Sequence, residues 1–498
     1  MTANPMAPEM PTTKMDNSLI RSLAWSATGD WVSQIFTWGA FLVILRLLAP
    51  SDFGIVALVA SFQPFLSYVS GFGIPRAVVT LRHLSDEQLA QLNTLGILLG
   101  LAGFGLAVLA AEPVALFFRM PHLAAVMVVS CLTLVTNGIQ SVSNGLLAKN
   151  MRFRTLSLLN ATSASIAAIV TLLLAWLHFG YWALVLGNLS AALVRTILVI
   201  LSRGQTYAIP KLGMLQEPLK FGWHVLVSLI ALNSYQNLDN LTAGRMLGQT
   251  ALGFYGMAWS LANVPLEKIT SLITTVIPTY LASLRNDLPA IRRYVRGITG
   301  NLSLVTFPAC VGLGVVAPEF VPLVMGHKWI GAVPPLEILA IYAAFRSIVA
   351  LLSKVLTALG NPRFVMWNDL ASVVVLGTAF YIGSHWGVTG IAWAWVVAYP
   401  PLVIPMFRKT FLSIEMSVGE YFRCVVPALQ GTIFMTVVVE GVRYALSRSE
   451  RTSLKLLIEV VAGAASYIGI LLLFHRKRAV AFLQLARTFG RQSGAPSV

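Results

Sequence analysis

A few charged side chains lie inside long apolar runs, and these are the residues that could do chemistry. Arg346 lies in the middle of one run, within Ala343-Ala-Phe-Arg-Ser-Ile348, and Lys354 follows about two helical turns later. On one helix the two would be about 80° apart and could border the same lumen. Charges inside membrane spans are expensive, so they commonly face a water-filled cavity or a partner. The pair predicts a cationic site for an anionic ligand; an Arg346 bonded to carbonyls of neighbouring helices is the alternative.

A second group of candidates surrounds a proline in an apolar run. Glu267 and Lys268 follow Pro265 closely. Adjacent residues of a helix point about 100° apart, so Glu267 and Lys268 do not simply pair with each other. Lys268 is a candidate phosphate contact, with a structural ion pair as the equal alternative, and Glu267 is a candidate for ion coupling or a gate. A proline inside a helix permits a kink, so Pro265 and Pro64, which lies about 200 residues earlier, are candidate hinges.

Two aspartates occupy similar places about 200 residues apart. Asp30 lies in the first apolar run, and Asp239 lies in the polar run Asn233-Ser-Tyr-Gln-Asn-Leu-Asp-Asn240, which suits a surface that faces water or sugar hydroxyls. Asp30, Asp239 and Asn240 are candidates for ion coupling or for a gate ion pair with a basic residue of the other half. A structural salt bridge within the membrane is the alternative. Asp369 is expected at the membrane interface or at a helix N-terminus.

Four arginines lie at the ends of apolar runs. Arg21 and Arg76 could meet an anionic ligand on one side of the membrane, although ordinary placement of positive charge in cytoplasmic loops explains them as well. Arg46 and Arg245, on the other side, could contact the ligand on release. The alternative for these two is a structural one, in which each bonds the free carbonyls of the preceding helix end.

The elements that position these residues are membrane helices. Of 498 residues, 57% are hydrophobic and 11% are charged, and the mean hydropathy is +0.76, whereas soluble domains carry about 25% charged residues. The net charge of +16 resides mainly in short loops, so it indicates membrane topology and no nucleic-acid partner. We expect an all-α polytopic membrane protein with about 14 spans, namely 20–45, 52–73, 85–111, 122–143, 156–178, 182–202, 222–245, 251–278, 298–325, 334–358, 365–384, 387–407, 424–445 and 455–474.

The orientation follows from the basic residues. With the N-terminus in the cytoplasm, about 23 Lys and Arg fall on the cytoplasmic side and about 7 outside, a strong bias for short loops. An even number of spans then places both termini in the cytoplasm. The first ~18 residues are polar and proline-containing, which is typical of a disordered tail and not of a signal peptide.

The stretch from Arg46 to Gly54 returns about 200 residues later, from Arg245 to Gly253, and it predicts a tight turn between two helices in each copy. Pro50 cannot continue the first helix, and Ser51 or Thr250 could cap the second. Further pairs follow in order. They predict two six-helix bundles related by a pseudo-two-fold parallel repeat, with a substrate path between them.

We therefore expect five segments along the chain, taken from the repeat and from the charge pattern. They are a disordered cytoplasmic tail at 1–18, an N-terminal six-helix bundle at 19–205, a C-terminal six-helix bundle at 206–415, an extra helix pair at 416–475 and a basic cytoplasmic tail at 476–498.

Several short stretches together resemble a known family. The chain resembles the Wzx-type polysaccharide-unit flippases of the multidrug/oligosaccharidyl-lipid/polysaccharide exporter superfamily, and within it the subgroup serving colanic acid, teichuronic acid and xanthan-type exopolysaccharides. The stretches are Arg46-Leu-Leu-Ala-Pro-Ser-Asp-Phe-Gly-Ile55, Met151-Arg-Phe-Arg154, Gly180-Tyr-Trp-Ala-Leu-Val185, Asn237-Leu-Asp239, Leu252-Gly-Phe-Tyr255, Gly326-His-Lys-Trp329 and Ala358-Leu-Gly-Asn361.

The resemblance implies a substrate and a place in the cell. It implies that an oligosaccharide repeat unit on undecaprenyl diphosphate is moved from the cytoplasmic to the periplasmic leaflet of the bacterial inner membrane, for exopolysaccharide or lipopolysaccharide synthesis. The lipid bilayer is then a partner, and a polysaccharide polymerase or export machinery is a further candidate partner. Alternating access between the two bundles would carry the transport.

The sequence lacks the motifs that are typical of nucleotide-binding proteins and metalloenzymes. It has no Gly-Lys-Ser/Thr motif and no dinucleotide glycine pattern, and its seven His are scattered singly. We expect no enzyme, no cofactor and no metal site. Two alternatives stay open: a drug or cation antiporter of the same superfamily, and a membrane polysaccharide polymerase or ligase. The latter class would show a large loop with catalytic residues, whereas the outer loops expected here have only about ten residues.

Overall fold

The structure is a computed structural model that describes most of the chain. The described residues are 36–81, 84–150, 152–202, 204–211, 235–274, 287–446 and 452–476, with position 34, a few positions between 213 and 226, and 478. This part is helical and contains no strand, as expected. Ten of its helices are long and apolar enough to cross a membrane, and a shorter apolar helix runs over Phe36–Leu47. The predicted total of fourteen stays a prediction: the helix over Pro50–Gly71 is not among the ten, and some predicted segments lie outside the described residues.

The helices of the first half follow the predicted spans closely. They are α2 (Pro50–Gly71), the short α3 (Ile74–Thr80), α4 (Asp86–Phe118), α5 (Leu123–Lys149), α6 (Phe153–Trp176) and α7 (Tyr181–Ser202). A capping box begins α4. Gln88 N donates to Ser85 Oγ at 3.2 Å, and Ser85 N donates to Gln88 Oε1 at 3.0 Å.

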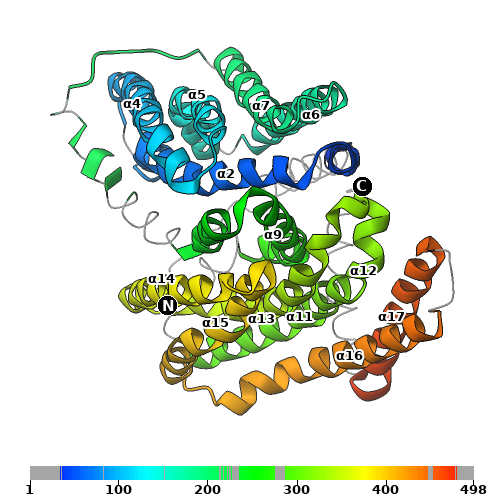
Figure 1. Cartoon of the computed structure of the whole chain (residues 1–498). Coiled ribbons are helices and arrows are strands. Elements are labelled where there is room, and N and C mark those ends of the chain that lie inside the picture. Colours follow the sequence, from blue (N-terminus) through cyan, green and yellow to red (C-terminus); the bar gives the residue numbers. More distant parts are fainter. Residues whose placement is uncertain are drawn as a thin grey trace, which may run out of the picture.

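The second half and the C-terminal pair continue the same pattern. Their elements are η1 (Tyr235–Asn237), α9 (Leu238–Thr274), α11 (Leu288–Val315), α12 (Ala317–Phe320), the π-helix η2 (Val321–Met325), the 3-10 helix η3 (His327–Ala332), α13 (Val333–Ala358), α14 (Pro362–Ser384), α15 (Gly387–Ser413), α16 (Val418–Ala445) and α17 (Thr452–Phe474). In Figure 1, α4 to α7 lie on one side of α2 and α9, and α11, α13, α14 and α15 lie on the other, with α16 and α17 at the edge.

One predicted span has the wrong bounds. The span expected at 298–325 is the helix α11, which begins ten residues earlier at Leu288 and ends at Val315. The early start has a local cause: the Asp287 side chain accepts a hydrogen bond from Ala290 N at 2.9 Å, which caps the helix. The first turns of α11 carry arginines, so hydropathy alone missed them. The segment after Val315 turns back through α12, η2 and η3 instead of continuing the helix.

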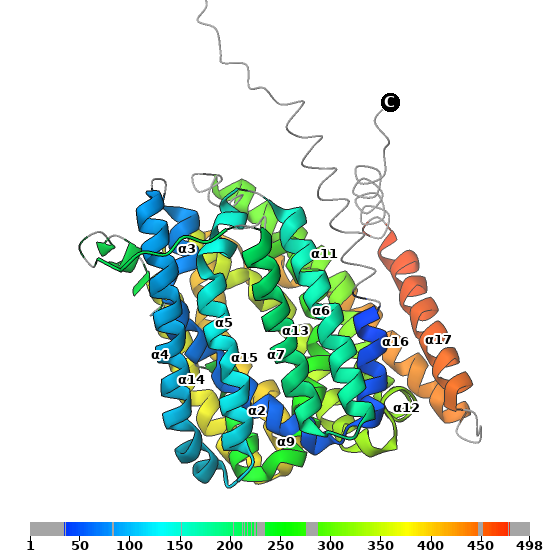
Figure 2. The ribbon, with the colours of Figure 1, turned by 90° about the horizontal axis from the view of Figure 1, so that it is seen from above.

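The two halves meet where α2 crosses α9, at the lower end in Figure 2. A Cβ added at Gly54 would lie 1.8 Å from Gln249 O, and one added at Gly253 would lie 1.9 Å from Pro50 O. The contact is reciprocal, because each glycine of one half meets the backbone at the start of the equivalent helix in the other. This pattern is what a two-fold axis between the halves produces, and it brings the two backbones into direct contact. We call this end of the molecule the crossing end.

The predicted caps at the crossing end are wrong, although the turns lie where we expected them. The N-cap of α2 is Ala49, and its N–H donates to Asp52 Oδ2 at 2.8 Å, so Ser51 does not cap the helix. In the second half, the break within α9 falls at Gly248, which has φ 84° and ψ 179°. Thr250 follows that break and lies inside the helix. A glycine adopts this positive φ without strain, which a hydroxyl residue would not.

Prolines leave two carbonyls without a donor, and side chains of the C-terminal region satisfy both. The first contact joins the helix pair to the second half, and the second joins the residues after α17 to α16. Pro308 in α11 has no N–H for Leu304 O, and Tyr467 of α17 donates to that carbonyl at 2.7 Å. Pro427 in α16 likewise leaves Arg423 O free, and Arg478 donates to it at 3.1 Å. The side chains beyond the second six-helix set therefore satisfy backbone groups that lipid could not.

Candidate functional site

A polar cavity of about 450 Å³ lies among α13, α14 and α15, close to the start of α9. It is the strongest candidate site because it holds charged and amide side chains within membrane-spanning helices. Both predicted cations of α13 line it. The polar residues of its wall are Gln236, Arg346, Ser353, Lys354, Thr357, Asn368, Asp369, Ser372 and Tyr399.

Arg346 contacts an amide and an indole ring. Its Nη1 donates to Asn263 Oδ1 at 2.9 Å, and its guanidinium carbon lies 5.8 Å from the centre of the Trp259 ring. Asn263 is only 2% exposed, and its amide nitrogen donates to Trp259 O at 2.8 Å. The amide is thereby oriented with its oxygen toward the arginine.

Lys354 lies two turns from Arg346 and lines the same cavity, as the helical spacing predicted. Asp369 was expected at the membrane interface or at a helix N-terminus, and the second of these is wrong: α14 begins at Pro362, and Asp369 lies further along the helix and lines the cavity. The interface stays a prediction. Within the described part of the chain, Lys354 and Asp369 form no ion pair with each other or with any other residue. The cavity thus holds two cations and one carboxylate.

Asp239 lies behind the cavity and is fully buried. Its carboxylate accepts hydrogen bonds from Tyr255 Oη at 2.7 Å, from Trp395 Nε1 at 3.2 Å and from Asn240 N at 2.8 Å. Among the described residues it has no ion pair, so neither the gate ion pair nor the structural salt bridge that we considered is found. Neutral donors from α9 and α15 satisfy it instead, which sequence spacing could not foresee.

An aromatic cluster separates Asp239 from the cavity. Trp259 stacks on Tyr342 at 5.8 Å between centroids, and Trp395 lies 4.7 Å from Tyr342 and 6.0 Å from Tyr399. Trp395 is 1% exposed, so most of this cluster packs the core. Tyr399 is the member that also lines the cavity, where a ring can stack on a sugar.

Arg46 and Arg245 both act across the crossing end, and not on their own helices. Arg46 donates to the carbonyls of Leu323 and Val324 in η2. Arg245 lies over the ring of Phe117, at the end of α4, at 4.9 Å. The predicted bonds to the preceding helix end are therefore wrong, because the opposite half offers each arginine a partner.

The same contact region includes two further residues of η3. Lys328 Nζ donates to Arg46 O at 2.8 Å, and Trp329 Nε1 donates to Leu45 O at 2.8 Å. Trp329 is fully buried and packs edge-on against Phe53 of α2, with ring centroids 5.2 Å apart. The orphan carbonyls at the end of the 36–47 helix are thus satisfied by the other half of the molecule.

The remaining candidates are spread over the molecule and not gathered in the cavity. Arg76 lies exposed on α3, and Glu267 is exposed on α9. The side-chain oxygen of Asn240 is buried without a hydrogen-bond partner. Pro64 lies inside α2 and Pro265 inside α9, as the hinge prediction requires. Arg21, Asp30 and the side chain of Lys268 lie outside the described residues.

Sequence reasoning missed some polar residues of the membrane region. Asn263, Asn368 and Gln236 surround Arg346 or its cavity, but single amides in apolar runs carry little signal. In the first half, Arg195 of α7 donates to Asn144 of α5 at 3.3 Å, and its Nε is buried without a partner. An arginine within an apolar run was the available signal for Arg195.

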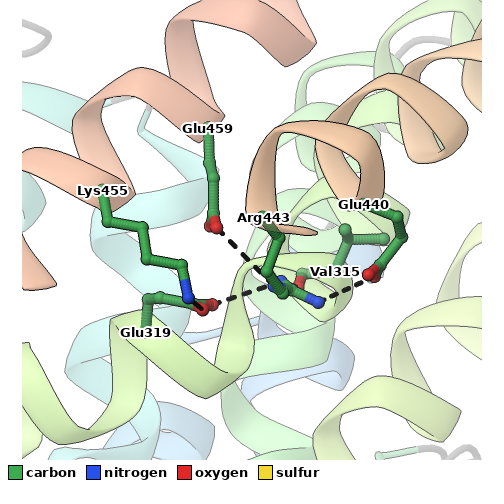
Figure 3. Close-up of polar contacts among 6 residues, drawn as sticks. All are labelled: Val315, Glu319, Glu440, Arg443, Lys455 and Glu459. Atoms are coloured by element: carbon green, nitrogen blue, oxygen red, sulfur yellow. Dashed lines mark hydrogen bonds and ion pairs between the residues drawn. The ribbon is translucent and has the colours of Figure 1, made fainter. Parts of the chain in front are cut away.

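A dense network of ion pairs lies at the crossing end, and the sequence analysis did not predict it (Figure 3). Arg443 of α16 lies 2.7 Å from Glu440, 3.2 Å from Glu319 of α12 and 3.6 Å from Glu459 of α17, while Lys455 of α17 lies 2.7 Å from Glu319. Glu459 is fully buried. The network joins α12, α16 and α17, so its role is to attach the helix pair to the second half.

No group of three His, Cys, Asp or Glu side chains that could hold a metal ion occurs in the described part of the chain. The three cysteines are free and buried, as expected of packing residues. The cavity therefore offers cations, amides and hydroxyls, which suit an anionic and hydroxyl-rich ligand.

Comparison with known proteins defines the class of the protein first. The fold is that of a solved lipid II flippase MurJ in an inward closed conformation, with a TM-score of 0.69 at 16% identity over 91% of this chain and 99% of that one. It is also that of an inward-facing multidrug resistance MATE family transporter, with a TM-score of 0.61 at 15% identity over 77% and 94% of the two chains. The chain is thus a multi-pass membrane protein with the fold of these transporters.

The family follows from the sequence. A family model described as polysaccharide biosynthesis protein matches residues 43–334, more than half of the chain, so this chain belongs to that family. It is 26% identical to the teichuronic acid biosynthesis protein TuaB of Bacillus subtilis (strain 168) over 82% of this chain and 85% of that protein. It is 25% identical to the lipopolysaccharide biosynthesis protein WzxC of Escherichia coli (strain K12) over 86% and 87%. The resemblance to Wzx-type flippases is confirmed, and the subgroup stays a prediction.

Proposed function

We propose that this chain is a flippase that moves oligosaccharide repeat units linked to undecaprenyl diphosphate from the cytoplasmic to the periplasmic leaflet of a bacterial inner membrane. The observation that carries the proposal is the cavity in which Arg346 and Lys354 lie within membrane-spanning helices. A diphosphate cannot cross hydrocarbon unaided, and cations that line a cavity can compensate its charge on the way. The chain is then a transporter and not an enzyme, with both termini in the cytoplasm.

The relatives support this substrate class. Two proteins that match about half or more of this chain are described as the probable low-salt glycan biosynthesis flippase Agl15 and the probable flippase AglR of Haloferax volcanii. Their descriptions agree with the flippase fold and with the family's role in polysaccharide biosynthesis. A polysaccharide polymerase or export machinery would take the unit after release.

The crossing end supports a mechanism of alternating access between bundles 19–205 and 206–415. In this state the halves are joined there by the contact of Gly54 and Gly253 and by Arg46 on η2. We infer that these contacts form the periplasmic closure and separate when the substrate is released. Pro64 and Pro265, which interrupt the hydrogen bonds of the two crossing helices, are the proposed hinges.

The test is a deletion of the gene in its own host, complemented by the wild type or by the double variant Arg346→Ala/Lys354→Ala. We expect deletion to abolish polymer and to leave lipid-linked units accessible only from the cytoplasmic side, as measured with a membrane-impermeant reagent on right-side-out vesicles. The wild type restores polymer and the double variant does not. Normal polymer with altered sensitivity to cationic drugs would favour the antiporter instead, and units that already face the periplasm would favour a polymerase or ligase.

A further inference from the structure

A second, smaller cavity lies at the end of the molecule opposite the crossing end, outside the candidate transport site. It has a volume of about 430 Å³ and lies between α11, α16 and Arg478, which comes shortly after the end of α17. Three of its lining residues are arginines, from two separate parts of the chain. The lining residues are Arg293, Arg296, Gly297, Gly300, Asn301, Leu304, Cys424 and Arg478.

The part of the cavity wall that α11 forms contains arginines and, beside them, glycines. Arg293, Gly297 and Gly300 recur at helical spacing, so they lie on one face of α11. A Cβ at Gly297 would meet nothing within 4 Å, and one at Gly300 would come no closer than 3.6 Å to Cys424 O of α16. The glycines therefore leave a hollow next to the arginines, with α16 as its opposite wall.

Arg478 is positioned by the backbone of α16. Its Nη1 donates to Arg423 O and to Cys424 O, each at 3.1 Å, and Pro427 is the reason that Arg423 O is free to accept. A guanidinium has five N–H groups. In the described part of the chain the other three make no bond, so Arg478 is fixed by one nitrogen and can offer the rest to an anion.

Carboxylates balance the positive charge of this cavity only in part. Glu420 forms an ion pair with Arg296 at 4.0 Å, whereas no carboxylate among the described residues pairs with Arg293 or Arg478. The neighbouring Arg292 differs, since it lies 3.4 Å from Glu415 on another face of the helix. Burial and the charge of Arg478 lower the pKa of the His475 imidazole, so it adds little charge at pH 7.

We propose that this cavity binds the phosphate headgroup of an anionic phospholipid. Guanidinium groups bind phosphate oxygens through paired hydrogen bonds, and basic pockets between membrane helices are known to hold lipid headgroups. The position favours a lipid over a soluble anion. Leu304, deeper in the cavity wall, belongs to the apolar part of α11, and Phe474, one turn before Arg478, is 73% exposed where an acyl chain would lie. The bound lipid would bridge α11 to the α16–α17 pair.

The test uses the purified full-length protein, stripped of lipid in neutral detergent. Phosphatidylglycerol or phosphatidylcholine with the same acyl chains is added, and Tm and lipid retention in native mass spectrometry are measured. We expect phosphatidylglycerol to raise the Tm of the wild type more than phosphatidylcholine does. Arg293→Gln/Arg296→Gln should weaken the apparent affinity at least about tenfold, which is about 1.4 kcal/mol.

Two matched variants separate the site from general charge and from misfolding. Arg292→Gln/Arg363→Gln removes the same charge from residues that do not line the cavity and should keep the response. Gly297→Leu keeps every charge but fills the hollow and should lose the response, while its Tm without lipid stays near that of the wild type. An equal response in the Arg293/Arg296 variant, or equal loss in the Arg292/Arg363 variant, overturns the proposal. If inorganic phosphate reproduces the effect of phosphatidylglycerol, the site binds a soluble anion and the proposal is also overturned.

Discussion

The ion network at the crossing end and the cavity beside α13 both hold basic residues within the membrane region, but they surround them differently. In the network, Arg443 and Lys455 face three carboxylates at 2.7 to 3.6 Å. In the cavity, Arg346 is bonded to an amide and lies over an indole ring. The cations of the network are paired with carboxylates and hold helices together, whereas the cations of the cavity line a space that a ligand could occupy.

The difference also predicts how substitution of a cation affects stability and ligand binding in each region. Removing a cation from a neutralised cluster leaves buried carboxylates uncompensated, so stability suffers. Removing a cation from the cavity should weaken ligand binding. It should leave fewer buried groups without a partner than removal of a cation from the network does. The variants below separate the two effects, with stability and transport measured on the same proteins.

The largest effect is expected for Arg443→Ala. Glu459 is fully buried, and without Arg443 it would lose its nearest cation at a cost of about 3–5 kcal/mol. Thermal unfolding in detergent would show a large loss of Tm, together with a loss of folded protein. Glu440→Gln is the control: Glu440 is 52% exposed, so its loss should change stability by at most about 1 kcal/mol. A wild-type Tm for Arg443→Ala would mean that the network does not attach the helix pair.

Arg346→Ala should affect transport more than stability. A charge-assisted hydrogen bond contributes about 1.5–3 kcal/mol, so we expect transport to fall at least about tenfold. The Tm should fall less than in Arg443→Ala, because the residue left behind is the neutral Asn263. The measurement is the rate at which lipid-linked units reach the outer leaflet. Arg346→Lys keeps the charge and should retain more activity than Arg346→Ala, unless the planar guanidinium itself is required.

Lys354→Gln should give a smaller effect in the same direction. Lys354 makes no hydrogen bond or ion pair within the described residues, so its loss leaves nothing unsatisfied and the Tm should not change. A point charge in a partly wet cavity contributes about 1 kcal/mol, and we expect a transport loss of about fivefold. A lower Tm without a transport defect would assign Lys354 to structure, like the cations of the network.

Asp369→Asn should have the smallest effect, and with the opposite sign. Asp369 is the carboxylate of the cavity wall, and it repels an anionic ligand. Replacing it with a neutral amide should lower the KM for the lipid-linked substrate by about threefold or less. A large loss of transport instead would show that the carboxylate has a role of its own, such as binding a coupling cation.

The sequence predicts the helices well and their side-chain partners poorly. The hydropathy runs placed the described spans, because burial in lipid dictates them. The repeat placed Gly54 and Gly253 at equivalent positions of the two halves, but it did not predict that they meet. The first turns of α11 were missed, since an interfacial helix need not be apolar. The α12–η3 segment was missed because its turns follow from contacts with the other half.

The candidate site was predicted in part. Arg346 and Lys354 share a cavity because helical spacing alone places them there. The partners of Asp239, Arg46 and Arg245 could not be foreseen, because each comes from a helix far away in the sequence. Trp395 reaches Asp239 from α15, and Phe117 reaches Arg245 from α4. A single aromatic or amide residue in an apolar run does not predict such a contact.

Pro308 in α11 and Pro427 in α16 make it difficult to remove the C-terminal part of the chain. Tyr467 and Arg478 cover acceptors in α11 and α16 that no longer have a donor of their own. A version that lacks α16 and α17 would leave Leu304 O without the donor that Tyr467 supplies, in a part of the helix where lipid offers no replacement. Such a version would need at position 308 a residue with a backbone N–H of its own.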